Sequence, residues 1–166
     1  MTVRVRPAQP SDGPALFAAW SNLRAHNSSI DRRIIPAPVS EQEFFEGLTE
    51  VFQRRASATF VAEVDGRLAG FISGGIEASQ PDRLPERHAT IGYLYVEPSC
   101  RRQGAGRDLF GAFTRWAASY EGVAHFEMPV LALDTGAEQF WKAMGFTPFI
   151  QRLWAPLSAG DGRDRE

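Results

Sequence analysis

Short stretches in which apolar and polar residues alternate predict β-strands in the first half of the chain. They cover residues 3–5, 59–64 and 68–76. The dipeptide Asp65-Gly66 separates the last two stretches, and this pair is a strong signal of a two-residue hairpin turn. Residues 88–96 are rich in β-branched and aromatic side chains, which favours a further strand ending before Pro98. The pattern therefore predicts antiparallel pairing around a hairpin.

Apolar residues spaced three or four positions apart predict two helices between the first and second strands. The segment from Ser11 to Pro14 supplies an N-cap and a first-turn proline for the first helix. We expect that helix to end in the polar stretch at residues 26–29. Ser40 and Glu43 have the spacing of a capping box, which opens the second helix.

Helices and strands alternate in the second half of the chain. The predicted elements are a helix over residues 107–120, a strand over 125–133, a helix over 135–144 and a strand over 149–154. Pro129 interrupts the first of these strands and indicates an edge, a bulge or a strand that has parted from its neighbour. Thr135 and Glu138 form a second capping box, and Gly145 is typical of a left-handed helix end.

The predicted order is one strand, two helices, three strands, and then helix, strand, helix and strand. It combines an antiparallel first half with a strand–helix–strand crossover, which indicates the α+β class. No repeat or linker divides the sequence. We therefore expect a single domain over residues 1–157, followed by a disordered tail over residues 158–166.

Composition excludes several classes of protein. A chain of 166 residues can bury a core without disulfides, and its one cysteine, Cys100, allows none within the chain. The 18 Lys and Arg against 20 Asp and Glu lack the basic excess of a nucleic-acid binder. No apolar run is long enough for a membrane span, and the first residues lack the apolar core of a signal peptide. We therefore expect a cytoplasmic protein with no nucleic-acid or membrane partner.

Two glycines, Gly104 and Gly106, lie where the strand over residues 88–96 gives way to a helix. Free amides at a helix start attract anions, glycines admit a phosphate close to the backbone, and two neighbouring arginines strengthen this preference. A tight turn with a solvated basic rim is the alternative interpretation. A dinucleotide fingerprint would need a glycine at Leu109, and a nucleoside-triphosphate loop would need a lysine, but Lys142 is the only lysine.

This segment resembles the signature of the Gcn5-related N-acetyltransferase (GNAT) superfamily, Arg/Gln-x-x-Gly-x-Gly/Ala after a strand ending in Val-x-Pro. Residues 101–106 match it after Val96-Glu97-Pro98, and residues 140–146 are similar to the family's Phe-Tyr-x-x-x-Gly-Phe. The resemblance spans roughly residues 3–157. It implies a GNAT-like fold: a central mixed, mostly antiparallel twisted sheet of six to seven strands, a V-shaped splay between strands 4 and 5, and four flanking helices.

The resemblance also implies an N-acetyltransferase that transfers an acetyl group from acetyl-CoA directly to a primary amine of a small molecule or peptide. The cofactor-binding residues would then be Leu94, Val96, Arg101, Arg102, Gln103, Gly104, Ala105, Gly106, Arg107 and Asp134. Asp134 holds the cofactor arm or only caps a helix. The backbone amide of Leu94 falls at the position that stabilises the oxyanion. No metal belongs to this expectation.

The sequence departs from the family at both catalytic side chains. Thr90 falls at the position of a frequent catalytic glutamate and Trp141 at that of a tyrosine acid, and neither can do that work. His88 lies two residues before Thr90, on the same strand face, and a free imidazole titrates near neutral pH. We hypothesise that His88 accepts the proton directly or through water; a half-exposed histidine at a strand start is the alternative. Glu77 and Glu86 are weaker candidates.

These departures leave other functions open. One is a catalytically weak or inactive CoA-binding sensor, motivated by Thr90 and Trp141, and another is an acyltransferase that uses longer acyl chains. The acceptor would meet residues 25–38 and 78–87, whose charges of both signs favour neither a cationic nor an anionic acceptor. The predicted last strand is apolar and leaves an edge for pairing, so a homodimer is a further expectation.

Overall fold

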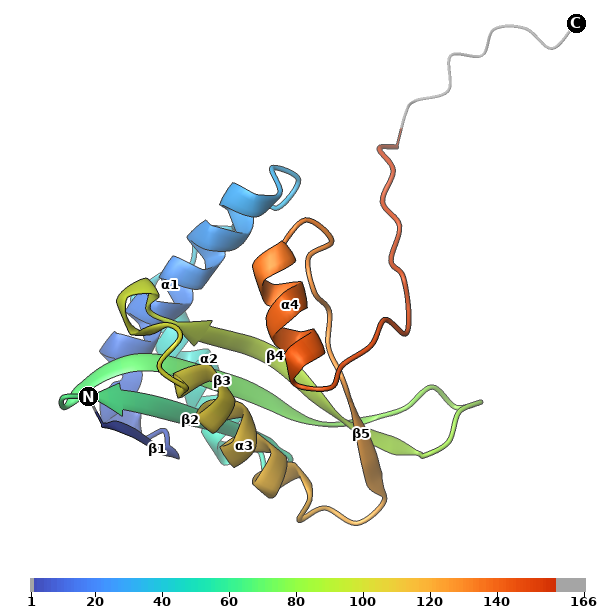
Figure 1. The fold of residues 1–166 in the computed structure, drawn as a ribbon, viewed down its shortest axis with the longest axis horizontal. Coiled ribbons are helices and arrows are strands. Elements are labelled where there is room, and N and C mark those ends of the chain that lie inside the picture. The colour runs from blue at the N-terminus through green and yellow to red at the C-terminus, as the bar shows by residue number, and fades with distance from the viewer. Residues whose placement is uncertain (1, 158–166) are drawn as a thin grey trace, which may run out of the picture.

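The structure, a computed structural model, describes residues 2–157, which form one mixed sheet flanked by helices (Figure 1). In the described residues the strands are β1 (Val3–Pro7), β2 (Ser57–Val64), β3 (Arg67–Ala78), β4 (Arg87–Val96) and β5 (Val123–Glu127), and they are neighbours in that order. The helices are α1 (Gly13–Ile30), α2 (Glu41–Gln53), α3 (Ala105–Ala117) and α4 (Thr135–Ala143), with short 3-10 turns at Pro10–Asp12 and Pro98–Cys100. This confirms the α+β class.

Pairing is antiparallel from β1 to β4 and parallel between β4 and β5. Asp65 and Gly66 both have positive φ, 51° and 76°, as the predicted hairpin between β2 and β3 requires. The Ser40 hydroxyl oxygen accepts a hydrogen bond from the Glu43 amide, and the Glu43 carboxylate accepts one from the Ser40 amide, which confirms the capping box of α2.

The sheet has a buried core on each face, because successive residues of a strand point to opposite sides. Under α3 and α4 the buried residues include Ala62, Ile72, Ala89, Ile91, Leu109, Phe113 and Trp141. Under α1 and α2 they are Leu16, Ala19, Val61, Phe71 and Tyr95. β4, which carries His88, Thr90, Leu94 and Val96 of the predicted site, lies between these two layers.

The predicted end of α1 is wrong, because the helix continues through the polar stretch to Ile30. Two contacts hold this last part in helical form. Ser29 donates to the His26 carbonyl, and the Asp31 amide donates to the Asn27 carbonyl. Polar residues with weak helix preference are tolerated here because their side chains bond locally instead of competing with the helix.

The last predicted strands are also partly wrong. β5 ends at Glu127, two residues before Pro129, instead of reaching Leu133. Residues 149–154 are not assigned to a strand, so the sheet of the described residues has five strands where six to seven were expected. The tail predicted over residues 158–166 lies outside the described residues. No helix among the described residues is both long and apolar enough to cross a bilayer.

Arg6 joins β1 to the rest of the fold through two carboxylates. It donates to Asp12 at 2.7 and 2.8 Å and to Glu63 at 2.6 and 2.9 Å, with only 22% of its side chain exposed. The hydrogen bonds from Arg6 lower the pKa of Asp12 below its ordinary value, against a smaller raising effect of burial. This network therefore stabilises the folded state when both acids are ionised.

We expect Arg6→Met to lower the free energy of unfolding by about 1–2 kcal/mol at neutral pH, because two partly buried carboxylates lose their partner. Since the folded-state pKa of Asp12 is depressed, this contribution exists above the unfolded pKa and disappears as pH falls through the folded one. Urea unfolding at neutral and strongly acidic pH measures the difference. Arg4→Met, at an exposed arginine two residues earlier on the same strand, is the control; equal losses for both variants would contradict the prediction.

Candidate functional site

The predicted signature segment connects β4 to α3 through a left-handed helix start. Gly104 is the N-cap of α3, with φ 90° and ψ −12°, and no side chain caps the helix. The first amides of a helix have no intrahelical acceptor, so those that follow Gly104 are free to donate to a ligand. Arg102 also has a positive φ of 61°, which turns the chain sharply just before these amides. The geometry is that of an anion site at a helix N-terminus.

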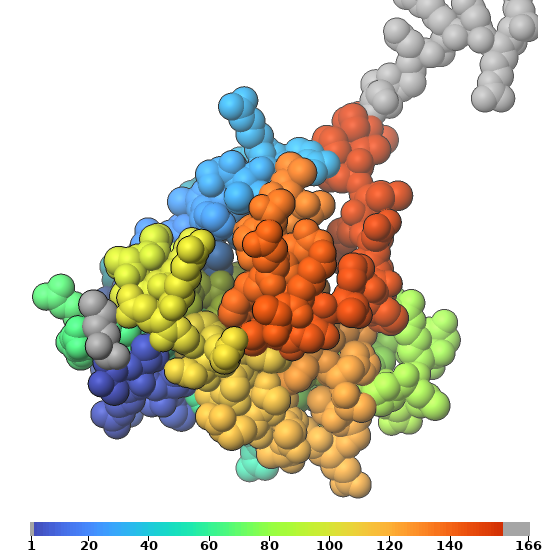
Figure 2. All heavy atoms as spheres, viewed as in Figure 1, coloured from blue at the N-terminus to red at the C-terminus, as the bar shows by residue number. Residues whose placement is uncertain are grey.

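Gly106 lies at the contact between α3 and α4. A Cβ at this position would be 3.2 Å from the Phe140 ring and 3.8 Å from a Val96 methyl group. Figure 2 shows the signature segment (yellow) and α4 (orange) side by side on one face, with a recess between them. A side chain here would press on the Phe140 ring, so glycine allows the two elements to lie this close.

The arginines of the signature segment differ in their contacts. Arg101 donates from its Nε to the Val96 carbonyl at 2.9 Å, so part of its guanidinium fastens the loop. Gln103 similarly donates to the Ser99 carbonyl. Arg102 and Arg107 are exposed at either side of Gly104. The loop is thus held by its own side chains while positive charge remains at its surface.

The β4–β5 pair confirms the predicted splay. Parallel pairs are present at Arg87, Ala89 and Thr90, and no later residue of β4 pairs with a described residue of β5. Leu94 and Val96, farther along β4, are paired only with β3. Alternate backbone N–H and C=O groups of this part of β4 therefore face the opening.

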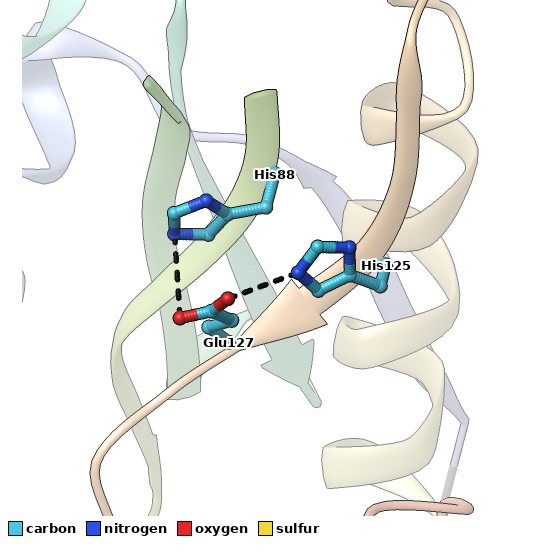
Figure 3. A group of neighbouring side chains, drawn as sticks. All are labelled: His88, His125 and Glu127. Atoms are coloured by element: carbon cyan, nitrogen blue, oxygen red, sulfur yellow. Dashed lines mark hydrogen bonds and ion pairs between the residues drawn. The ribbon is translucent and has the colours of Figure 1, made fainter. Parts of the chain in front are cut away.

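Three titratable side chains gather where β4 and β5 are still paired, and we call them the histidine–glutamate cluster (Figure 3). They are His88 on β4 and His125 and Glu127 on β5. His125 Nε2 lies 3.0 Å from Glu127 Oε1, and His88 Nε2 lies 3.8 Å from Glu127 Oε2. His88 is buried, with 8% of its surface exposed, and its Nδ1 lies 3.1 Å from Ser79 Oγ.

The carboxylate of Glu127 holds a negative charge at this site. The hydrogen bond from His125 lowers the pKa of Glu127 below its ordinary value; partial burial opposes this, and the charges of His88, His125 and Arg83 add to the lowering. That carboxylate lies 3.8 Å from His88 Nε2 and 3.0 Å from His125 Nε2, close enough to attract a positive charge placed between them. The cluster can therefore take up a proton and stabilise the positive charge that results.

Glu127 lies beside Thr90, the position at which the family resemblance led us to expect a glutamate. The two residues are partners in the parallel register, so their side chains lie next to each other on one face of the sheet. The acid missing from β4 at position 90 is thus present on the neighbouring strand. The Thr90 hydroxyl is itself buried and has no hydrogen-bond partner in the described structure.

Other predicted residues have structural roles. Trp141 is buried, 5% exposed, with edge-on contacts to Phe110 and Phe146, so it belongs to the core. Asp134, not Thr135, caps α4 by accepting from the Ala137 amide at 2.9 Å.

Asp134 makes a second contact that links two helices. Its other carboxylate oxygen lies 3.2 Å from Nε2 of His26 on α1, and thereby connects α1 to the start of α4. Glu77 pairs with His88 across β3 and β4 but is exposed, and Glu86 lies in the preceding loop. Neither glutamate is part of the cluster.

Sequence reasoning missed His125 and Glu127. The available signal was the His-x-Glu spacing just before Pro129, which puts both side chains on one face of a strand. Two imidazoles and a carboxylate are also donors that suit a transition metal, and their ligand atoms all lie within 4.8 Å of one another.

Comparisons with known proteins agree on one fold and one kind of chemistry. Residues 21–146 match the sequence profile of the Acetyltransferase (GNAT) family. An aminoglycoside N(6')-acetyltransferase type 1 from Klebsiella aerogenes is 26% identical over 150 residues, covering 89% of this chain and 91% of that protein.

Two solved structures show the same fold. The aminoglycoside N-acetyltransferase AAC(6')-Iy in complex with CoA has a TM-score of 0.71 at 17% identity, over 93% of this chain and 94% of that one. A mutant of the BH1408 protein from Bacillus halodurans has a TM-score of 0.81 at 17% identity, over 93% and 99% of the two chains.

Proposed function

The chain belongs to the GNAT family of acetyltransferases, whose co-substrate is acetyl-CoA, and we propose that it acetylates a primary amine of a small molecule. One observation carries the proposal: the uncapped start of α3 lies beside an opened edge of β4. The first feature suits the pyrophosphate of CoA and the second suits its pantetheine arm, which can bond to a free strand edge. A 26% identical relative that acetylates aminoglycosides makes these amines the first acceptors to test.

The proposed reaction is a direct transfer. The lone pair of the neutral amine attacks the thioester carbonyl carbon, a C–N bond forms, and the C–S bond breaks to release the thiolate. The Leu94 amide donates to the oxygen that gains negative charge. Its place beyond the last β4–β5 pair supports this role, because only there is the edge of β4 open.

The histidine–glutamate cluster supplies the proton acceptor that an ammonium substrate needs. In this proposal His88 takes the proton, directly or through water, and Glu127 stabilises the imidazolium across 3.8 Å. His125 holds the carboxylate in place with its 3.0 Å hydrogen bond and acts as a positioning residue. Trp141 donates no proton, so the thiolate leaves without help or is protonated by solvent.

Calorimetric titration with acetyl-CoA and with CoA tests the cofactor half of the proposal. We expect one molecule bound per chain at micromolar concentration for both. A lack of binding at millimolar concentration would contradict the assignment. A CoA-binding sensor would also bind both CoA and acetyl-CoA. This experiment therefore tests whether the signature segment holds the cofactor, and does not test whether the protein transfers the acetyl group.

The presence of the histidine–glutamate cluster favours an enzyme over such a sensor. A buried imidazole facing an ionised carboxylate suits proton transfer, whereas binding of CoA alone makes no use of it. The use of longer acyl chains remains a separate alternative, because the width of the splay at the acyl group decides it.

We further propose a homodimer formed through residues 149–157. Five large apolar side chains of this segment are 60% to 100% exposed: Phe149, Ile150, Leu153, Trp154 and Leu157. The segment lies extended beside the body of the molecule (Figure 1), while the outer edge of β5 pairs with no described residue. Within the described part of the chain, residues 149–157 have no sheet edge to pair with, and the outer edge of β5 has no partner strand. In a dimer, this segment of one copy can pair with the β5 edge of the other.

The apolar area that this segment exposes is large enough for a dimer interface. Burying these five side chains removes on the order of 700 Å² per protomer, close to the roughly 800 Å² per partner of a standard interface. Trp154 already lies 5.4 Å from the guanidinium of Arg33, beside the predicted acceptor segment. The partner's segment would therefore also border the acceptor site.

We expect analytical ultracentrifugation to show a dimer for the unaltered chain and a monomer for the Phe149→Asp/Leu153→Glu variant, because charges cannot be buried without partners. Leu84→Asp, at an equally exposed leucine in another loop, is the control and should leave the dimer intact. A monomeric unaltered chain at high micromolar concentration would contradict the dimer. A dimer that survives the double substitution would place the interface elsewhere.

A further inference from the structure

We propose that the histidine–glutamate cluster binds a divalent transition-metal ion, with Zn²⁺ as the best match, and that the bound ion inhibits acetyl transfer. The binding claim stands on geometry alone. The inhibition claim rests on the proposed function, because it requires His88 to be the proton acceptor.

The three donor atoms converge on one point. In Figure 3 the Nε2 atoms of His88 and His125 point toward the Glu127 carboxylate from two sides. The two residues on β5 share a face because they are two positions apart, and the parallel register brings His88 to the same place from β4. All three ligand atoms lie within 4.8 Å of one another, before any side chain moves.

The separations suit a small ion. Zn²⁺ lies about 2.0–2.2 Å from nitrogen and oxygen ligands, so the ligands of a tetrahedral ion are about 3.4 Å apart. The observed 3.0 Å from His125 to Glu127 and 3.8 Å from His88 to Glu127 lie on either side of that value. The widest separation, up to 4.8 Å, must close by about 1.4 Å, and the His125 ring has room to rotate because 39% of its side chain is exposed.

The outer contacts prepare His88 as a ligand. Metal-bound histidines usually donate their other ring N–H to a neighbouring acceptor, which fixes the ring and its tautomer. The Ser79 hydroxyl, 3.1 Å from His88 Nδ1, can accept that proton and leave the Nε2 lone pair facing Glu127. Burial of His88 further means that few water contacts are lost when an ion replaces its proton.

Charge also favours a cation. With both imidazoles neutral, the cluster carries the single negative charge of Glu127, whose pKa is lowered mainly by the hydrogen bond from His125. Arg83 contributes an opposing positive charge, while Glu77 faces His88 from β3 and adds a negative one. Two nitrogens and one carboxylate oxygen favour Zn²⁺ and neighbouring transition metals over Mg²⁺ or Ca²⁺, which prefer oxygen ligands.

Inhibition follows from competition for one lone pair. A metal ion on His88 Nε2 occupies the electrons that would accept the substrate proton, so the metal-bound protein cannot use that base. Protons compete for the same nitrogen atoms, so metal affinity should fall as pH decreases.

The test is calorimetric titration with ZnCl₂, using a Cys100→Ser background to remove the one thiol, together with the absorption spectrum of the Co²⁺-loaded protein. We expect one equivalent of Zn²⁺ at micromolar affinity or tighter. His125→Ala should weaken binding at least about tenfold, while His26→Gln, which alters the one histidine outside the cluster, should leave it unchanged. No binding below high micromolar concentration, or equal affinity in His125→Ala, would overturn the site.

The same proteins test inhibition separately. Acetyl transfer should fall over the Zn²⁺ range in which calorimetry shows binding, and a chelator should restore it. Zn²⁺ binding to the cluster without loss of activity would support the metal site but contradict the proposed inhibition. It would also show that His88 is not the proton acceptor. Calorimetry needs no active enzyme, so failure to find an acceptor amine would not affect the binding result.

Discussion

Glu127→Gln lowers kcat for acetyl transfer about a hundredfold, because a general base and its partner contribute on the order of 10²–10⁴ to such reactions. Glutamine keeps the size of the side chain and can still accept from His125, but it no longer stabilises a charged His88. The loss should shrink as pH rises, because a growing share of the substrate amine is then already neutral and needs no base. Steady-state kinetics between pH values on both sides of neutrality measure both effects.

Partner variants show whether the cluster acts as one unit. His88→Asn should give a loss similar to that of Glu127→Gln, and the double variant should lose little more, because either change already disables the pair. Glu86→Gln, at an exposed glutamate outside the cluster, is the control for a change of charge alone. Calorimetry should find the same acetyl-CoA affinity in all of them. Losses that multiply in the double variant would show that His88 and Glu127 act independently.

Gly106→Val abolishes detectable acetyl-CoA binding, with an expected loss of at least about a hundredfold, equivalent to about 3 kcal/mol. A Cβ here would lie 3.2 Å from the Phe140 ring and the valine methyl groups reach farther, so we expect the start of α3 to shift away from α4. The amides that follow Gly104 then no longer point to one place, and a site built of fixed amides loses its anion. Calorimetric titration with acetyl-CoA measures the change.

Gly111→Val is the matched control for this substitution. It lies on the same helix, where a Cβ would meet only the end of the Arg115 side chain at 3.6 Å. Because valine changes the helix propensity by a similar amount at both positions of α3, a difference between the two variants reflects the position and not the residue type. Circular dichroism checks that both fold. Unchanged affinity in a folded Gly106→Val protein would show that the loop does not hold the cofactor.

The sequence was informative where structure is decided by neighbouring residues. The Ser40–Glu43 capping box, the Asp65-Gly66 turn and the Gly104–Gly106 segment all depend on contacts within a few positions, and all are confirmed as structural features. The end of α1 was predicted wrongly because its polar residues are held by local side-chain bonds and by the contact of His26 with Asp134. That contact joins residues more than a hundred positions apart and leaves no local pattern.

The histidine–glutamate cluster was predicted only in part for the same reason. His88 was found from its place on the strand, whereas Glu127 becomes its neighbour through the register of two parallel strands joined by α3. A shift of one residue in that register would send both β5 side chains to the other face. The predicted strand over residues 149–154 failed for another reason. Its apolar pattern favours a strand, but a strand forms only where a neighbouring strand offers hydrogen-bond partners, and the pattern does not show where that neighbour lies.

The most direct test of the account is thiol release from acetyl-CoA when a panel of amines, aminoglycosides first, is added to the purified protein, with the acetylated product identified by mass spectrometry. The account predicts amine-dependent release of one thiol per acetylated amine, which Glu127→Gln suppresses without loss of acetyl-CoA binding. Binding of acetyl-CoA without transfer to any amine in a broad panel would contradict it and favour the sensor.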